Sequence, residues 1–551
     1  MRSWNIFFAL GLVAQALAVS HSCFAQPPSR GREIPSDRDV KAYFDKLAPA
    51  TKSTVLHDTT GPEAGADVGV ITAVIPDPDH PEFSVFWVRD AGFVYHAWMN
   101  ELTVLGDKSL RPLADDTTHA LIRTQQVISL AGNVFTGGLE EAVFDVKINP
   151  IQSEDARIGS PAADGPPFRA SVLLDYAEWL IQPEQDNGTW VADVLWPKLN
   201  LDLQWIASHW NLSSYDLWWP CVWGGSYWTA SLQYRALRGG ARLGRAIGRG
   251  RDVVGEYDSQ ASMILDYLQT FWNEKEGFMT ETTITNVSEG RSGYGSAPLT
   301  VSVYNFDPSL GCDDATFQPC SPRALSSLKV VGDHFKEFFP ISRNFTDKQP
   351  PFFGFFTEDQ FLGGHPQFFS SFNSAEQLYD ALITWDLVGF LDVTRVDLKF
   401  WRQFDSAVKI GRYNKGSKKY NALTNAVHDW ANKIVLQLAA NTPEDYVLVE
   451  CVHKEHGGPY GPRGMIRSLA AALGVYDAYN GLVPRNWGHP IPQQTRDDRE
   501  DVFASTGADE VIEWDADHDD GYRGVDPDLY RGRRLRLPSR FEDTTRHRYG
   551  H

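Results

Sequence analysis

The sequence predicts an all-α protein in which long helices stack into a toroid, with a site formed by the loops at one end. Apolar residues recur at helical spacing in many long segments, clean strand alternation is scarce, and aromatic, Gly/Pro-rich connections separate the helical segments. The chain has 551 residues, of which 42% are hydrophobic and 13% aromatic. This composition provides a large core and excludes a mainly disordered protein.

The individual helices follow from the same periodicity. Ala170–Ile181, for example, carries apolar residues at every fourth position along one face. Ser374-Ala-Glu-Gln377 has the pattern of a capping box, which predicts that a helix begins there and continues through Trp385. Further long helices are predicted over Val191–Trp210, Ser226–Ile247, Tyr420–Ala440 and Met465–Tyr479. From Pro484 onward the chain is rich in Asp and Arg and interrupted by Pro, which predicts a wrapping or loose tail.

The charge balance limits the partners of the protein. The chain has 51 Lys and Arg against 71 Asp and Glu, which gives a net charge of −20. So acidic a chain is poorly suited to a phosphate backbone or an anionic membrane surface. We therefore expect a monomer that binds a small-molecule substrate, with no nucleic-acid partner and no membrane association after removal of the leader.

The N-terminus has the pattern of a secretory signal peptide. A basic start precedes an apolar stretch and small residues at the cleavage site, which predicts removal of residues 1–25. Four Asn-x-Ser/Thr sequons follow, which favours a glycosylated, secreted protein. The predicted glycosylation sites are Asn187, Asn211, Asn286 and Asn344.

Four cysteines remain in the mature chain, an even set that is typical of an oxidising compartment. Cys312 and Cys320 lie in one tight Pro/Asp-rich loop, so we expect a local disulfide between them. Cys221 and Cys451 would then pair by elimination. The alternative is that these two remain free thiols and act as nucleophiles.

Several motifs occur in a fixed order along the chain. They are Trp87-Val-Arg-Asp-Ala-Gly92, Asp164-Gly-Pro-Pro-Phe-Arg-Ala170, Trp210–Trp218, Cys312–Leu325, Ala375–Leu382 and Val483–Gly488. Together they resemble the glucoamylases of glycoside hydrolase family 15 over about Gly69 to Gly488. The resemblance implies an (α/α)6 barrel for residues 26–488. Residues 489–551 are expected to form a charged tail with no starch-binding module, so raw starch is not an expected substrate.

The resemblance also identifies the two catalytic positions. Inverting glucosidases need one carboxyl group that protonates the leaving oxygen and a second that activates water. The position of the base falls on Glu450, but the position of the acid falls on Trp219. An indole has no proton to transfer near neutral pH, and the loss of a general acid costs about 10²–10⁴-fold in rate.

The substrate-binding residues implied by the resemblance are only partly retained. Phe355 stands where the family has Arg, Phe83 where it has Tyr, and Ile158 where it has Trp. These exchanges remove hydrogen-bond partners for sugar hydroxyls and predict an apolar, aromatic-lined pocket. The candidate substrate-binding set is Phe83, Arg89, Asp90, Ile158, Asp216, Trp218, Phe355, Glu358 and Asp359.

Metal and cofactor motifs are weak. His453 and His456 are spaced i, i+3 without an evident third ligand. Asp515–Asp526 begins like a calcium loop but lacks its Gly and its final Glu. We therefore expect no metal and no cofactor.

Three functions fit these observations. The favoured one is an enzyme recruited to a non-hydrolytic reaction on a hydrophobic small molecule, such as cyclisation, isomerisation or dehydration. Glu450 would be the proton-transfer group, and a role in secondary metabolism would suit such a pocket. The second is hydrolysis of α-glucosides with a substitute acid. The third is a secreted binder without catalysis.

Overall fold

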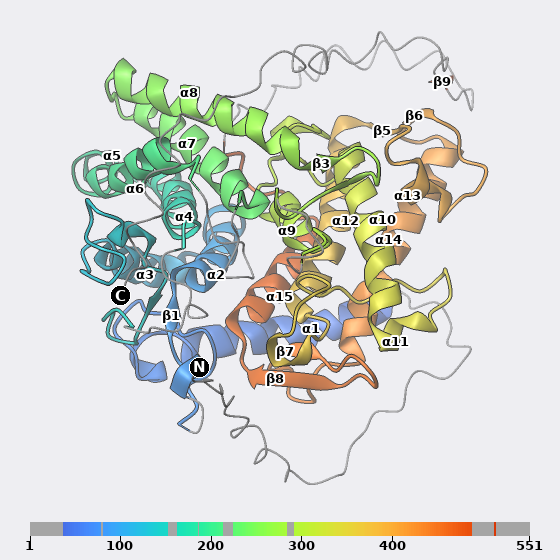
Figure 1. Ribbon diagram of the computed structural model, residues 1–551, viewed down its shortest axis with the longest axis horizontal. Helices are drawn as coiled ribbons and strands as arrows, with labels where there is room; N and C mark the ends of the chain where they lie inside the picture. The colour runs from blue at the N-terminus through green and yellow to red at the C-terminus, as the bar shows by residue number, and fades with distance from the viewer. Residues whose placement is uncertain are drawn as a thin grey trace, which may run out of the picture.

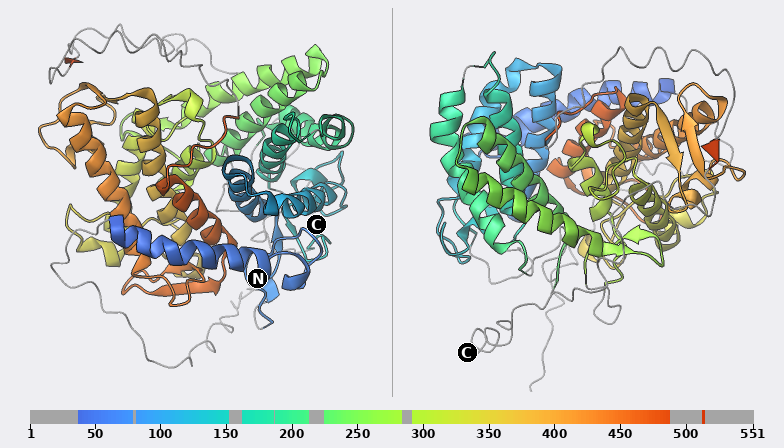
Figure 2. Two further views of the ribbon diagram at one scale, coloured as in Figure 1. Left: turned by 180° about the vertical axis from the view of Figure 1, so that it is seen from behind. Right: turned by 90° about the horizontal axis from the view of Figure 1, so that it is seen from above.

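The helices of the protein form two concentric layers in the computed structural model (Figures 1 and 2). The structure describes residues 37–78, 81–151, 162–185, 187–212, 224–283, 291–487 and 512–513. Within these ranges each helix of the inner layer contacts the next, and the last contacts the first, so the inner layer is a closed ring. The inner helices are α2 (Val88–Asn100), α4 (Gly165–Leu180), α7 (Tyr227–Ala246), α9 (Ala297–Tyr304), α12 (Phe368–Val388) and α15 (Ile466–Tyr479).

The outer layer covers this ring. Each outer helix packs against an inner neighbour, for example α8 against α7 and α14 against α12, and α1 lies across α14 and α15 (Figure 2). The outer helices are α1 (Asp37–Ser53), α3 (Arg111–Thr124), α6 (Trp196–His209), α8 (Arg251–Leu268), α10 (Pro322–Phe338) and α14 (Lys418–Ala439). Short helices fill connections: α5 (Gly188–Trp190), α11 (Pro340–Arg343) and α13 (Leu398–Arg402). The predicted all-α toroid is confirmed as an (α/α)6 barrel.

Burial distinguishes the two layers. Every residue of α9 and nearly every residue of α4 is buried, because an inner helix is covered on both sides. The outer helices bury one face only; α8, for instance, buries Val254, Tyr257, Ala261, Ile264 and Leu268 at helical spacing.

The strands are short, and every pair that the structure describes is antiparallel. They are β1 (Phe86–Trp87) with β2 (Val143–Phe144), β3 (Trp272–Asn273) with β4 (Phe278–Met279), β5 (Phe390–Val393) with β6 (Gly411–Asn414) and β9 (Ile512–Glu513), and β7 (Val449–Val452) with β8 (Pro459–Arg463). The β7–β8 hairpin directly precedes α15 and carries Glu450.

Most predicted helices are confirmed within a few residues, but the start predicted from the capping box is wrong. Helix α12 begins at Phe368, and Ser374 lies inside it, where its hydroxyl donates to the carbonyl oxygen of Ser370 (2.8 Å). The aromatic residues Phe368, Phe369 and Phe372 are fully buried. Their burial in the ring extends the helix past the local signal.

Other sequence predictions have different outcomes. The Cys312–Cys320 disulfide is confirmed, with Cα atoms 4.9 Å apart. Asn211 and Asn344 are exposed and Asn187 is half-buried, while Asn286 lies outside the described residues; glycosylation itself stays a prediction. None of the described helices is long and apolar enough to cross a membrane.

Candidate functional site

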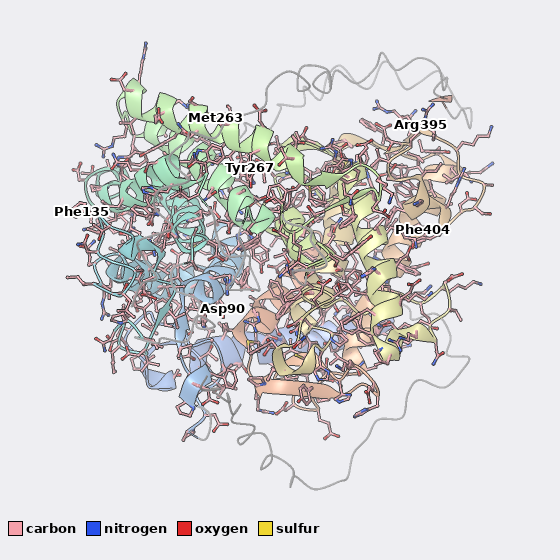
Figure 3. All side chains as sticks on the ribbon, in the orientation of Figure 1. Asp90, Phe135, Met263, Tyr267, Arg395 and Phe404 are labelled. Carbon is pink, nitrogen blue, oxygen red and sulfur yellow. A yellow bond between two sulfur atoms is a disulfide. The ribbon has the colours of Figure 1, made fainter. Side chains whose placement is uncertain are left out.

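The candidate site lies where the first turns of the inner helices meet. Arg89 and Asp90 occupy the first turn of α2, and Asp90 lies near the middle of the molecule (Figure 3). Arg467 occupies the first turn of α15, and Glu450 comes from β7. Three different elements, α2, α15 and β7, therefore supply side chains to one small region.

Glu450 lies opposite an irregularity in its hairpin. The pairing register of β7 and β8 shifts between Val449 and Cys451, which is typical of a β-bulge that re-aims a side chain. Gly461 of β8 has a φ of +97°, and a Cβ atom there would lie 3.2 Å from the Cβ of Glu450. The glycine thus allows the close approach of the two strands at the candidate base.

Arg467 joins two buried carboxylates. Its Nη2 donates to Glu450 Oε1, and its Nη1 lies 3.6 Å from Asp90 Oδ2. Its guanidinium carbon lies 5.3 Å from the ring centre of Phe355. The side chain of Glu450 is fully buried and that of Asp90 is 3% exposed. This cluster of Arg467, Glu450, Asp90 and Phe355 is the centre of the site.

Two carboxyl groups of the region have raised pKa values. Burial raises the pKa of Glu450, Arg467 opposes this rise and Asp90 adds to it. Burial also raises the pKa of Asp359 to about 6; the backbone N–H of Phe361, which donates to Asp359 Oδ1 at 2.8 Å, opposes the rise, and nearby Glu450 adds to it. Asp359 can therefore carry a proton in mildly acidic solution.

Two further ion pairs surround this centre. Arg89 Nη1 donates to Asp164 Oδ2 (3.0 Å), and the indole N–H of Trp228 donates to the same oxygen (3.0 Å). Arg291 donates to the buried Glu281 (2.7 Å). The three arginines thus neutralise part of the negative charge, and each is held by a carboxylate.

In this region, four buried carboxylate oxygens have no hydrogen-bond partner among the described residues. They are Asp90 Oδ1, Glu358 Oε2, Asp359 Oδ2 and Glu450 Oε2. The other oxygen of Glu358 accepts from the backbone N–H of Ser292 (3.0 Å). Because native proteins rarely bury an acceptor without a donor, these oxygens indicate a ligand or water that donates hydrogen bonds.

The structure brings together several of the predicted site residues. Glu450, Asp90 and Phe355 contact Arg467, and Asp359 lies within electrostatic reach of Glu450. Arg89 lies in the same helical turn as Asp90. Phe83 is half-buried in the short 3-10 turn Pro81–Phe83 ahead of β1. Ile158, Asp216, Trp218, Trp219 and Cys221 lie outside the described residues.

The expected apolar character of the pocket is not supported around Glu450. Phe355 is buried, but its ring packs against the guanidinium group of Arg467, and the same guanidinium donates to Glu450. Sequence reasoning missed Arg467, Arg291 and Asp164. One signal for Arg467 was present, because it is the first charged residue at the start of an otherwise apolar helical segment.

The predicted pairing of Cys451 with Cys221 is corrected by the structure. Cys451 is a free, buried cysteine, and its sulfur accepts a hydrogen bond from Gln367 Nε2 (3.2 Å). Burial raises the pKa of its thiol well above the ordinary value, and Glu450 adds to the rise. A thiol in such surroundings remains protonated, which disfavours a nucleophilic role.

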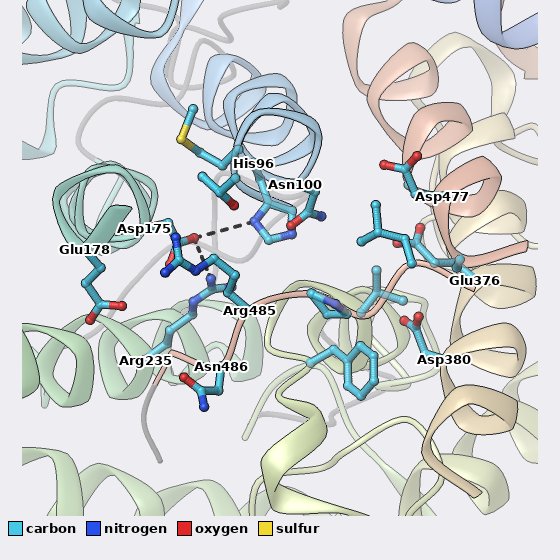
Figure 4. Close-up of a pocket in the computed structure, with 18 residues that line it drawn as sticks. His96, Asn100, Asp175, Glu178, Arg235, Glu376, Asp380, Asp477, Arg485 and Asn486 are labelled. Carbon is cyan, nitrogen blue, oxygen red and sulfur yellow. Dashed lines mark hydrogen bonds and ion pairs between the residues drawn. The ribbon is translucent and has the colours of Figure 1, made fainter. Parts of the chain in front are cut away.

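A cavity lies at the opposite end of the ring, toward the ends of α2, α4 and α15 (Figure 4). Glu376 and Asp380 of α12 and Asp477 of α15 line one side, and Arg235 and Arg485 lie on the other. Burial raises the pKa values of all three acids, that of Asp477 to about 7.

Comparisons with known proteins agree with this architecture. The family model described as "Glycosyl hydrolases family 15" matches residues 56–473. Glucoamylase-1 of Schizophyllum commune is 35% identical over 451 residues, which cover 81% of this chain and 75% of that protein. The glucoamylase of Neurospora crassa is 32% identical over 457 residues, covering 82% and 70%. The solved structure of the family 15 glucoamylase from Hypocrea jecorina superposes with a TM-score of 0.77 at 31% identity, covering 82% of this chain and 75% of that one.

Proposed function

The chain belongs to glycosyl hydrolase family 15, and we propose that its site binds the terminal sugar of an α-glucoside and hydrolyses it with Glu450 as the base. Cleavage is slow wherever the leaving group needs a proton, because Trp219 stands at the acid position implied by the resemblance. The observation that carries the proposal is the set of buried carboxylate oxygens without partners among the described residues.

A sugar supplies what these oxygens lack. Each hydroxyl group of a pyranose can donate one hydrogen bond, and a buried acceptor left unpaired costs about 1–3 kcal/mol. A hydrophobic ligand would leave Asp90, Glu358 and Asp359 unpaired and would have to displace water from them. The site therefore favours a polyhydroxylated ligand over the hydrophobic small molecule predicted from the sequence.

The proposed reaction follows the inverting scheme. Glu450 Oε2 takes a proton from water while the water oxygen attacks the anomeric carbon. The bond from that carbon to the leaving oxygen breaks, and its electron pair stays on the leaving oxygen. With no acid at position 219, that oxygen takes its proton from solvent, which costs about 10²–10⁴-fold in rate.

The test uses two substrates that differ in their need for an acid. In maltose the leaving group is the second glucose unit, an alcohol whose oxygen requires a proton, whereas α-glucosyl fluoride releases fluoride ion and requires none. We expect release of β-glucose from the fluoride at a readily measured rate and release from maltose that is slower by about 10²–10⁴-fold.

A matched variant separates the acid from the rest of the site. Trp219→Glu should raise the rate with maltose and leave the rate with the fluoride within a few fold. If wild type neither binds glucose nor turns over either substrate, the proposed function is wrong. Equal rates on both substrates in wild type would mean that another group supplies the proton, with Asp359 the first residue to test.

A further inference from the structure

Among the described residues, Arg467 contacts three partners that come from different parts of the fold. Glu450 lies on β7, Asp90 on α2, and Phe355 on the connection that precedes α12. The arginine side chain is 13% exposed. A planar guanidinium group with two carboxylates along its edge and a phenyl ring against its face has little rotational freedom.

This arrangement also fixes the two carboxylates. Arg467 occupies Oε1 of Glu450 and lies close to Oδ2 of Asp90. The second oxygen of each carboxylate is buried and has no partner within the described ranges. One oxygen of each group therefore faces the guanidinium, and the other stays available to a bound molecule.

We propose that Arg467 is a positioning residue that keeps Glu450 ionised and aims its second oxygen at the nucleophilic water. The kinetic part of this inference rests on the proposed function. Arg467 touches neither water nor sugar in this scheme and acts through Glu450.

The electrostatic reason lies in the groups that face Glu450. They are Asp90 from α2, Asp359 from the loop before α12, Cys451 from β7 and Arg467 from α15. Arg467 is the one cation in this set, and the others either carry negative charge or are neutral. Burial alone would raise the pKa of Glu450 further, so removal of the arginine should protonate the base at higher pH.

The first experiment compares pH profiles of kcat/KM for α-glucosyl fluoride in wild type, Arg467→Met and Arg467→Lys. The acidic limb of the profile is the pH range in which kcat/KM falls as Glu450 becomes protonated. In Arg467→Met the midpoint of this limb should move up by about 1–3 pH units, and kcat should fall by a larger factor than KM rises. Arg467→Lys retains the charge without the planar fork, so the limb should return toward wild type while kcat stays reduced.

The chain provides a matched control. Arg412 on β6 pairs with Asp392 (2.7 Å) and lies over the ring of Phe390 (3.6 Å), as Arg467 does with Glu450 and Phe355, but it belongs to the β5–β6 sheet. Arg412→Met should leave both the limb and kcat within twofold of wild type. An unshifted acidic limb in Arg467→Met would overturn the inference.

A second experiment needs no activity. Thermal unfolding at pH 7 is measured for wild type, Arg467→Met, Glu450→Gln and the double variant. Glu450→Gln should lower Tm in wild type, because it leaves the buried arginine short of a partner, and raise Tm in Arg467→Met, because it removes an unpaired buried carboxylate. Two changes of the same sign and size would show that the residues are not coupled, and the inference would fail.

The two experiments separate the two proposals. If Glu450→Gln changes Tm with opposite signs in wild type and Arg467→Met, but no substrate is hydrolysed, the Arg467–Glu450 pair is supported and the proposed glycosidase function is wrong. If the substrates are hydrolysed, but the acidic limb of Arg467→Met is unshifted and the Tm changes show no coupling, the proposed function is supported and the role of Arg467 is wrong.

Discussion

Glutamates buried at the two ends of the ring differ in the charged groups beside them. At the end where the inner helices begin, Glu450 and Asp90 face Arg467. At the other end, Glu376 and Asp380 line a cavity whose arginines lie on the far side (Figure 4), and burial raises the pKa of each acid well above its ordinary value. A cation at hydrogen-bond distance keeps a buried carboxylate charged, whereas burial without one keeps it protonated. The buried glutamates at the two ends therefore differ in whether a cation lies at hydrogen-bond distance.

The largest expected effect is on hydrolysis, when a buried carboxyl group is removed from one end of the ring or from the other. Glu450→Gln removes the group that accepts the proton of water, so kcat/KM for α-glucosyl fluoride should fall by about 10²–10⁴-fold. Glu376→Gln removes a carboxyl group of the same type at the opposite end and should leave kcat/KM within a few fold. Steady-state kinetics of both variants provide the measurement, and comparable losses in the two would mean that the functional end has been assigned wrongly.

The next effect concerns stability at the cavity end. Burial and Glu101 raise the pKa of Asp477 to about 7, while Lys52 opposes the rise. The contribution of the protonated Asp477 side chain to the free energy of unfolding is complete below the unfolded-state pKa of about 3.9. It is lost as the pH rises through 7, because the buried group must then ionise. Asp477→Asn cannot ionise, so it should be more stable than wild type at pH 8 by about 2–4 kcal/mol and have no such advantage at pH 4.

Denaturant unfolding at the two pH values measures this difference directly. Asp445→Asn is a useful control because Asp445 is paired with Arg463 and has a lowered pKa, so its replacement should not stabilise the protein at pH 8. An advantage of Asp477→Asn that is equal at both pH values would show that ionisation is not its cause.

The sequence predicted the framework of both ends better than their charges. Helical periodicity located α14 and α15 within two residues, because a helix of the wall must present apolar faces at a fixed spacing. The ordered motifs located Glu450, Asp90 and Arg89. The partner of Glu450 was not predictable, since Arg467 and Glu450 lie on different elements and only the closed ring brings them together.

Two errors have related physical causes. The capping-box pattern at Ser374 predicts a helix start at that residue. The burial of Phe368 and Phe369 in the ring outweighs this local preference, so the helix begins at Phe368. The apolar pocket was inferred from Phe355, Phe83 and Ile158, which stand where the family has Arg, Tyr and Trp. The structure places a guanidinium against the ring of Phe355 from position 467, so the positive charge comes from another helix.

Variants of Phe355 and Arg467 test whether the position of this positive charge matters, with a smaller expected effect on kcat/KM. Phe355→Arg places a second guanidinium beside Arg467 and should weaken kcat/KM by about tenfold through repulsion and loss of the ring. The exchange Phe355→Arg with Arg467→Phe restores one cation and one ring in swapped places. We expect it to recover part of the loss of either single variant, and an additive loss would show that the location of the charge matters more than its presence.

The smallest effect separates Cys451 from the disulfide-bonded pair. Cys451→Ser retains an acceptor for the N–H of Gln367, so unfolding should change by about 1 kcal/mol or less. Loss of the Cys312–Cys320 disulfide by Cys312→Ser should cost about 2–3 kcal/mol in the chain-entropy model for a loop of this length. If Cys451 were bonded to Cys221, the much longer loop would make the loss of that disulfide the larger of the two, about 5–6 kcal/mol. The order of the two variants in denaturant unfolding therefore tests whether Cys451, next to Glu450 in the chain, carries the free thiol that the structure shows.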